Sequence, residues 1–208
     1  MKALYEWRMS FGNPVEVRED PQTGGKIIVG YAAVFNKLSE ELWGFREKIA
    51  PGAFAGVLTN DVRGLFNHNE TIVLGRSKNG TLELVEDELG LHYRIKPPKT
   101  QAANDVVELL STGYVDGSSF GFFVDEDNWD ESGDMPIRTI VKIKELIDVG
   151  PVTFPAYPDT MAASSGRSIF EARQKHQAPH EPGRSVELLR KKLSLTERTL
   201  KTLSTRRI

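Results

Sequence analysis

The chain has 208 residues and a net charge of -2 at pH 7, with 39% hydrophobic, 9% aromatic and 27% charged residues. This composition is that of an ordinary folded protein and excludes a collagen-like, mucin-like or wholly disordered chain. Cysteine is absent, which excludes disulfides, a thiolate nucleophile and a zinc site built from cysteine. No apolar run approaches the roughly 18–20 residues of a membrane span, and the N-terminus has no signal-peptide pattern. With only four histidines, we expect neither a metal site nor a cofactor.

Charge divides the chain into two parts. Residues 165–208 hold 11 basic and 4 acidic residues, whereas the remainder holds 16 basic and 25 acidic ones. Pro179 and Pro182 lie where the composition changes from β-branched and aromatic to Gln-, Arg- and Lys-rich. We therefore predict a body at residues 1–160, a linker at 161–184 and a basic helical tail at 185–208.

The body is predicted to consist mainly of strands, with turns at Gly24-Gly25, Asn79-Gly80 and Glu88–Gly90. Apolar or alternating runs bounded by such turns are Lys26–Phe35, Val62–His68, Thr81–Val85, Leu89–Lys96, Val115–Val124 and Arg138–Val149. Two segments are predicted to be helical, Ala53–Leu58 and Ala102–Leu110. Many strands and few helices favour a mainly β fold with helices (α+β), as a β-barrel or a sandwich.

The tail has an apolar residue every three or four positions for about three heptads. These residues are Val186, Leu189, Leu193, Leu200 and Leu203, with Thr196 completing the pattern. A helix this short is marginal alone in water, so it should pack on a partner, on a second copy of itself or on the body. The alternative is a basic helix surrounded by solvent.

Residues 113–124, GYVDGSSFGFFV, hold the first candidate for chemistry. In a strand, Ser119 shares one face with Gly117 and Gly121, while Ser118 lies among aromatic residues on the face expected to be core. Glycine inside a strand often marks a place where a ligand or another backbone comes close. Ser119 is thus a candidate nucleophile; the alternative is a surface serine in a β-bulge.

A serine nucleophile needs a base and a group that orients the base. His68 follows an apolar strand and has polar neighbours, which suits proton transfer at neutral pH. His92 is expected to be half-buried in a sheet, and His176 and His180 to be solvated. Glu145 and Asp148 lie in a later apolar stretch, and regular alternation would point them to opposite faces, so at most one should reach His68. A salt bridge to Lys142 or Lys144 is the alternative partner and suits Glu145 better.

Taken together, four stretches resemble the prohead proteases of tailed bacteriophages, which are serine proteases of capsid maturation. They are GYAAVFN at 30–36 with FREKIAPGAF at 45–54, LFNHNETIVLGR at 65–76, GSSFGFFV at 117–124 and ELIDVGPVTFPAYPDT at 145–160. The resemblance implies a β-barrel of the herpesvirus maturation protease type, ringed by helices. It also implies the catalytic residues Ser119, His68 and Asp148. Here Gly150 replaces the serine that usually follows the acid.

The resemblance further implies a serine endopeptidase that works in the host cytoplasm inside the assembling procapsid. Its substrates would be scaffold or major capsid protein segments and the protease itself, cleaved by acyl transfer. Backbone N–H groups at Phe120 and Gly121 are the candidate oxyanion donors, and Glu145 is the alternative acid. The tail would tether the enzyme to scaffold or shell, or mediate self-association. No membrane or specific nucleic-acid partner is expected, since the body is acidic and no aromatic-basic interleaving marks a binding face. An inactive β-barrel that assists capsid assembly or binds scaffold is the competing interpretation.

Overall fold

The computed structural model describes residues 5–10, 14–42, 44–154 and 174. Apart from position 174, the predicted linker at 161–184 and the whole predicted tail at 185–208 lie outside the described residues. His176 and His180 lie outside them as well. Every strand of the described part falls between Tyr5 and Val152.

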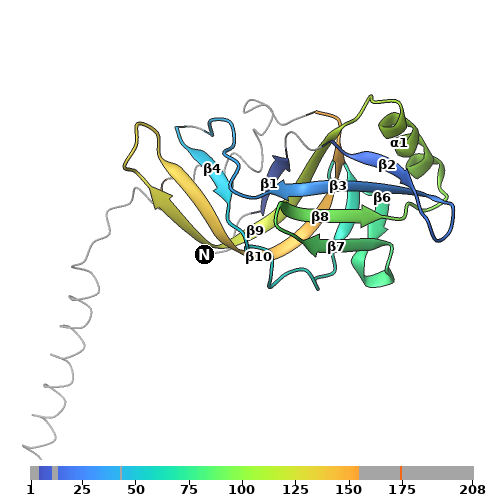
Figure 1. Cartoon of the computed structure of the whole chain (residues 1–208), viewed down its shortest axis with the longest axis horizontal. Coiled ribbons are helices and arrows are strands. Elements are labelled where there is room, and N and C mark those ends of the chain that lie inside the picture. The colour runs from blue at the N-terminus through green and yellow to red at the C-terminus, as the bar shows by residue number, and fades with distance from the viewer. Residues whose placement is uncertain (1–4, 11–13, 43, 155–173, 175–208) are drawn as a thin grey trace, which may run out of the picture. The chain divides into compact units, whose positions relative to one another are not determined.

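The larger of two sheets carries the candidate site and has six strands in the order β1-β9-β10-β5-β6, with β4 pairing on β10. Its strands are β1 (Tyr5–Ser10), β4 (Arg46–Ile49), β5 (Arg63–Phe66), β6 (Asn69–Arg76), β9 (Gly117–Asp130) and β10 (Ile137–Val152). The two longest strands, β9 and β10, are antiparallel neighbours and form a long curved ribbon in Figure 1. Strand β10 pairs in parallel with β5, and β1 adds to the outer edge of β9.

The smaller sheet has four strands in the order β2-β3-β8-β7 (Figure 1). They are β2 (Glu16–Glu19), β3 (Lys26–Val34), β7 (Leu82–Glu86) and β8 (Gly90–Ile95), and the 3-10 turn η1 (Ser77–Asn79) precedes β7. The turns predicted at Gly24-Gly25 and Glu88–Gly90 connect β2 to β3 and β7 to β8. Ile28 and Tyr93 from this sheet share one buried core with Phe120 and Leu146 from the larger sheet. The prediction of a mainly β fold is confirmed; closure into a herpesvirus-type barrel stays a prediction.

One α-helix occurs among the described residues, α1 (Gln101–Ser111), where the sequence predicts residues 102–110. The Thr100 side chain caps it by accepting a hydrogen bond from the Ala103 backbone N–H. Its apolar face, including Val106 and Leu110, joins the core.

The helix predicted at Ala53–Leu58 is wrong. The segment belongs to a series of turns that begins at Pro51 and includes Gly52, whose φ is +85°. Its backbone N–H groups bond three residues back, as in Val57 to Phe54 at 2.9 Å, rather than four.

Candidate active site

Ser119 lies on the face of β9 opposite the core. Its neighbours along the strand, Phe120 and Phe122, are buried in the core, as the alternation predicts. The Ser118 hydroxyl also points to the core side, where it donates to the Tyr93 hydroxyl at 3.2 Å. Of the two adjacent serines, only Ser119 therefore faces the histidine predicted as its base.

His68 is held in a tight hairpin turn between β5 and β6. Phe66 pairs with Asn69, and the two residues between them, Asn67 and His68, both have φ of +55°. A positive φ at both central positions is what a type I′ turn requires, and Asn and His tolerate it better than most residues. The predicted strand over Val62–His68 therefore ends at Phe66, and His68 occupies the turn.

Asn67 ties this turn to the end of β10. Its side-chain N–H donates to the Thr153 hydroxyl at 3.0 Å, and its side-chain oxygen accepts from the Thr153 backbone N–H at 2.8 Å. Its own backbone N–H donates to the Pro151 carbonyl at 3.0 Å. Sequence analysis missed this role, although an Asn directly before the candidate base in a hairpin turn was a usable signal.

Asp148 is the acid that reaches His68, but not for the reason that alternation suggests. Strand β10 has a β-bulge between Leu146 and Asp148, so Glu145 pairs with Phe123 and Asp148 pairs with Gly121. Since Phe123 and Gly121 are two residues apart, both acids lie on the same face of the sheet. The expectation of opposite faces is thus wrong. Glu145 is exposed, and Lys142 pairs instead with Asp125 and Glu126.

Three side chains form a continuous chain of hydrogen bonds. His68 Nε2 lies 2.7 Å from Ser119 Oγ, and His68 Nδ1 lies 2.5 Å from Asp148 Oδ1. The Asp148 side chain is only 2% exposed, and that of His68 is 16% exposed. A buried carboxylate on one ring nitrogen fixes the tautomer that leaves the other free to accept a proton.

Strand β1 supplies two aromatic side chains that the sequence did not indicate. Register pairs Trp7 with Gly121 and Tyr5 with Phe123, which places both on the Ser119 face. The Trp7 ring stacks on the His68 imidazole with centroids 5.2 Å apart. The Tyr5 hydroxyl donates to Asp148 Oδ2, the carboxylate oxygen that His68 does not use. The alternation of YEWRMS was the available signal, but six residues at the start of the chain gave no reason to pair them with β9.

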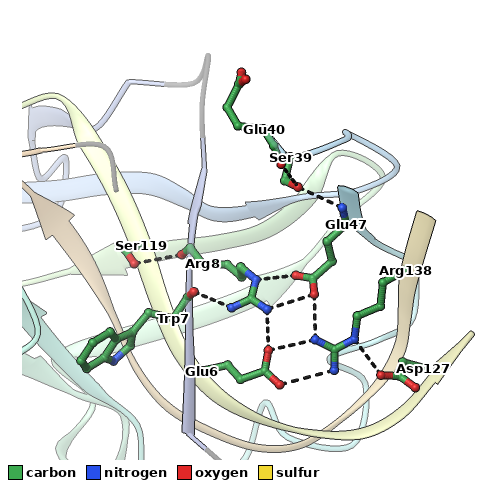
Figure 2. A network of polar contacts seen from close by, with 9 residues as sticks. All are labelled: Glu6, Trp7, Arg8, Ser39, Glu40, Glu47, Ser119, Asp127 and Arg138. Carbon is green, nitrogen blue, oxygen red and sulfur yellow. Dashed lines mark hydrogen bonds and ion pairs between the residues drawn. The ribbon is translucent and has the colours of Figure 1, made fainter. Parts of the chain in front are cut away.

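The Ser119 hydroxyl has two competing acceptors. Besides His68 Nε2, its Oγ lies 2.9 Å from the Arg8 carbonyl oxygen, to which it can donate (Figure 2). One hydroxyl proton serves one of these acceptors at a time, so only the population that bonds to Nε2 is poised for proton transfer. Ser119 has no exposed surface, and a peptide can therefore reach Oγ only after neighbouring groups move.

A groove of about 1020 Å³ lies beside His68 and Asp148. Its walls include the Trp7 and Tyr5 rings, apolar side chains such as Leu65, and charged side chains of both signs. Ser119 is not among the residues that line this groove.

Two glycines leave space that the site uses. A Cβ on Gly121 would overlap the Tyr5 hydroxyl and Asp148 Oδ2. A Cβ on Gly150, where the resemblance leads us to expect serine, would overlap the Leu65 carbonyl oxygen. At Gly121 the space is filled by side chains, the Tyr5 hydroxyl and the Asp148 carboxylate, rather than by the ligand or backbone that a glycine beside Ser119 led us to expect.

The candidate oxyanion donors lie inside the sheet. Phe120 pairs with Arg8 on one side and Val149 on the other, and Gly121 pairs with Trp7 and Asp148.

His92 is half-buried in β8 as predicted, where burial lowers the pKa of its imidazole. The described residues hold no cluster of three or more potential metal ligands, and none of their helices is long and apolar enough to cross a membrane.

A mainly β fold in which a serine, a histidine and an aspartate are joined by hydrogen bonds is typical of a serine hydrolase. A family model described as caudovirus prohead serine protease matches residues 13–175, and the chain belongs to this family. The bacteriophage T4 capsid assembly protease, gp21, is a similar solved structure with 10% sequence identity and a TM-score of 0.42. The match covers 73% of this chain and 97% of that one. No protein with a curated description matches the chain.

Proposed function

We propose that the protein is a serine endopeptidase of procapsid maturation, with Ser119 as nucleophile, His68 as general base and Asp148 as the residue that orients His68. The observation that carries this proposal is the hydrogen-bonded series from Ser119 Oγ through both ring nitrogens of His68 to Asp148 Oδ1. Membership of the prohead serine protease family supports it independently.

The geometry suits acyl transfer in two stages. As Ser119 Oγ attacks the scissile carbonyl carbon, its proton passes to His68 Nε2, and Asp148 stabilises the resulting imidazolium through Nδ1–H. His68 then gives the proton to the departing amine, which leaves an ester on Ser119. A water molecule loses a proton to His68 as it attacks this ester, and the proton returns to Oγ when the acid product leaves.

The oxyanion donors belong to this proposal as well. Backbone N–H groups at Phe120 and Gly121 follow the nucleophile directly, which is a common place for such donors. Because β1 and β10 flank both residues, a freed N–H requires a neighbouring strand to shift when substrate binds. The burial of Ser119 calls for movement at the same place.

The family's name supports a role in the prohead. We propose that the enzyme acts inside the assembling procapsid in the host cytoplasm, on scaffold or major capsid protein segments and on its own chain. The basic tail would tether it there or allow self-association. Deletion of residues 165–208 should then leave fewer protease copies per procapsid, while the reaction of Ser119 with a small probe is unchanged. Equal incorporation would contradict the tether.

The second candidate is an inactive assembly or scaffold-binding factor. Contact among a serine, a histidine and a carboxylate favours the enzyme, since scaffold binding alone requires none of them. Co-expression with the capsid and scaffold proteins, followed by mass spectrometry, separates the two. The wild-type chain should give new termini in these proteins and in itself, and Ser119→Ala should give none. Ser118→Ala is the matched control and should cleave, because Ser118 faces the core. Cleavage that persists in Ser119→Ala, or is absent from wild type, would contradict the proposal.

A further inference from the structure

The first strand contributes to the site although it precedes the part that the family model matches. That match begins at residue 13, whereas β1 spans Tyr5–Ser10. Two aromatic rings of β1 face the site and contact the two residues proposed to act on Ser119. Trp7 stacks on His68, and Tyr5 donates a hydrogen bond to Asp148.

The Asp148 carboxylate has a separate donor for each oxygen. Oδ1 lies 2.5 Å from His68 Nδ1, and Oδ2 accepts from the Tyr5 hydroxyl. Burial and then the negative charge of Asp148 raise the pKa of Tyr5, with a smaller contribution from Glu70, so the phenol stays protonated as a donor. Two donors on opposite oxygens fix both the place and the rotation of the carboxylate, which a single bond to His68 would not.

The surrounding structure makes room for this contact. Gly121 lies opposite Asp148 in the neighbouring strand, and a Cβ there would occupy the space where the Tyr5 oxygen meets Asp148 Oδ2. The Tyr5 ring is itself held between Trp7, at a centroid distance of 5.3 Å, and Phe123, at 5.6 Å. The glycine two residues after the nucleophile is therefore explained by the tyrosine.

The other face of β1 is anchored by buried ion pairs (Figure 2). Arg8 binds Glu47 through Nε at 2.5 Å, and both Arg8 and Arg138 contact Glu6. Arg138 also binds Glu47 at 2.9 Å, which connects β1 to β4 and β10. Because Glu6 and Arg8 alternate with Tyr5 and Trp7, fixing one face of the strand fixes the rings on the other.

We propose that Tyr5 is a positioning residue, whose hydroxyl holds the Asp148 carboxylate in the orientation that fixes the His68 imidazole. This rests on the proposed function, since orientation of His68 matters only if His68 acts as a base. Tyr5 touches no reacting atom. Its donated hydrogen bond holds the Asp148 carboxylate in this rotation while His68 carries the proton.

The test compares Tyr5→Phe with Tyr31→Phe. Tyr5→Phe keeps the ring contacts and removes one oxygen. Tyr31→Phe removes a similar bond, from the Tyr31 hydroxyl to Asp87 Oδ2 at 2.7 Å, in the other sheet. The rate of Ser119 modification by a fluorophosphonate, measured against pH, should fall about ten- to hundredfold in Tyr5→Phe. The acid midpoint of its pH profile should shift, and Tyr31→Phe should match wild type in both.

A second measurement needs no turnover. In the Ser119→Ala chain, the proton NMR signal of His68 Nδ1–H reports the bond to Asp148. Adding Tyr5→Phe should move this signal, whereas adding Tyr31→Phe should not.

If Tyr5→Phe fails to fold, the exchange of the Tyr5 hydroxyl proton with water is measured instead. Slow exchange in wild type that is lost in Asp148→Ala supports the contact, and fast exchange in wild type overturns it. An unchanged rate, pH profile and Nδ1–H signal in Tyr5→Phe would overturn the proposal. Absence of labelling in wild type would instead contradict the proposed function, and the NMR response would still decide the role of Tyr5.

Discussion

His68 and Asp148 are separated by 80 positions in the chain, yet Nδ1 of one lies 2.5 Å from Oδ1 of the other. The parallel pairing of β5 with β10 produces this meeting, because it places the hairpin turn that follows β5 beside the end of β10, and the His68 side chain reaches Asp148 from there. The position of the imidazole thus depends on sheet register together with the local turn at Asn67 and His68.

The acid should be essential for reactivity but not for folding. Asp148→Asn keeps the size of the side chain and can hold the wrong imidazole tautomer, so labelling of Ser119 should fall by about three to four orders of magnitude. Glu145→Gln is the matched control, because Glu145 lies on the same face but is exposed. We expect it to label at the wild-type rate. A larger loss in Glu145→Gln than in Asp148→Asn would exchange the roles of the two acids.

Asn67 should matter through its side chain and not only through its backbone angle. Asn67→Gly permits the positive φ but loses both bonds to Thr153, and Asn67→Ala adds the conformational cost. We expect each variant to lower the free energy of unfolding by about 1–3 kcal/mol, with the larger loss in Asn67→Ala. Both variants should also slow the labelling of Ser119. Urea unfolding and labelling rates measure these effects. Wild-type stability in both variants would show that the turn does not need the two hydrogen bonds between Asn67 and Thr153.

The buried ion pairs that anchor β1 should be costly to break. Arg138 is 2% exposed and contacts Glu6 and Glu47, so Arg138→Met leaves two buried carboxylates without this partner. The free energy of unfolding should fall by about 3–5 kcal/mol. Arg18→Met, which breaks the exposed pair with Glu16, should cost no more than about 1 kcal/mol. Similar losses in urea unfolding for the two variants would contradict the buried network.

Acid should weaken the same network. Burial alone would raise the pKa of Glu6, but the charges of Arg8 and Arg138 outweigh it and hold that pKa below the ordinary value of 4.5. Folding therefore favours the ionised carboxylate. Its stabilisation is complete well above pH 4.5 and is lost as the pH falls through the lowered folded-state pKa. Unfolding free energies measured from pH 7 to pH 3 should decline in wild type and decline less steeply in Glu6→Gln. Equal slopes would contradict this account.

Local pattern indicated two of the three proposed catalytic residues: Ser119 lies between glycines on its own face, and His68 lies at the end of an apolar strand. It left Glu145 and Asp148 open, because both are acids in one apolar stretch, and the resemblance to the prohead proteases implied Asp148. Alternation also separated Ser119 from Ser118, because the Phe residues on the Ser118 side had to form the core.

What the sequence could not supply was register. A one-residue bulge in β10 brings Glu145 and Asp148 to the same face of the sheet, and no local sequence pattern predicts this bulge. Strands β1, β2 and β4 were not predicted because each has only four to six residues and is stabilised by pairing with distant partners. Because β1 was not predicted, the contribution of Tyr5 and Trp7 to the site was missed as well. The turns at Ala53–Leu58 were mistaken for a helix because their apolar spacing suits one, although Gly52 and Gly56 disfavour it.

Peptide mapping of the full chain after treatment with a fluorophosphonate tests the central claim most directly. We predict a single adduct on the peptide that contains Ser119, lost in Ser119→Ala, strongly reduced in His68→Ala and retained in Ser118→Ala. An adduct on another residue, or equal labelling of the wild-type and His68→Ala chains, would show that the arrangement of Ser119, His68 and Asp148 does not activate a nucleophile.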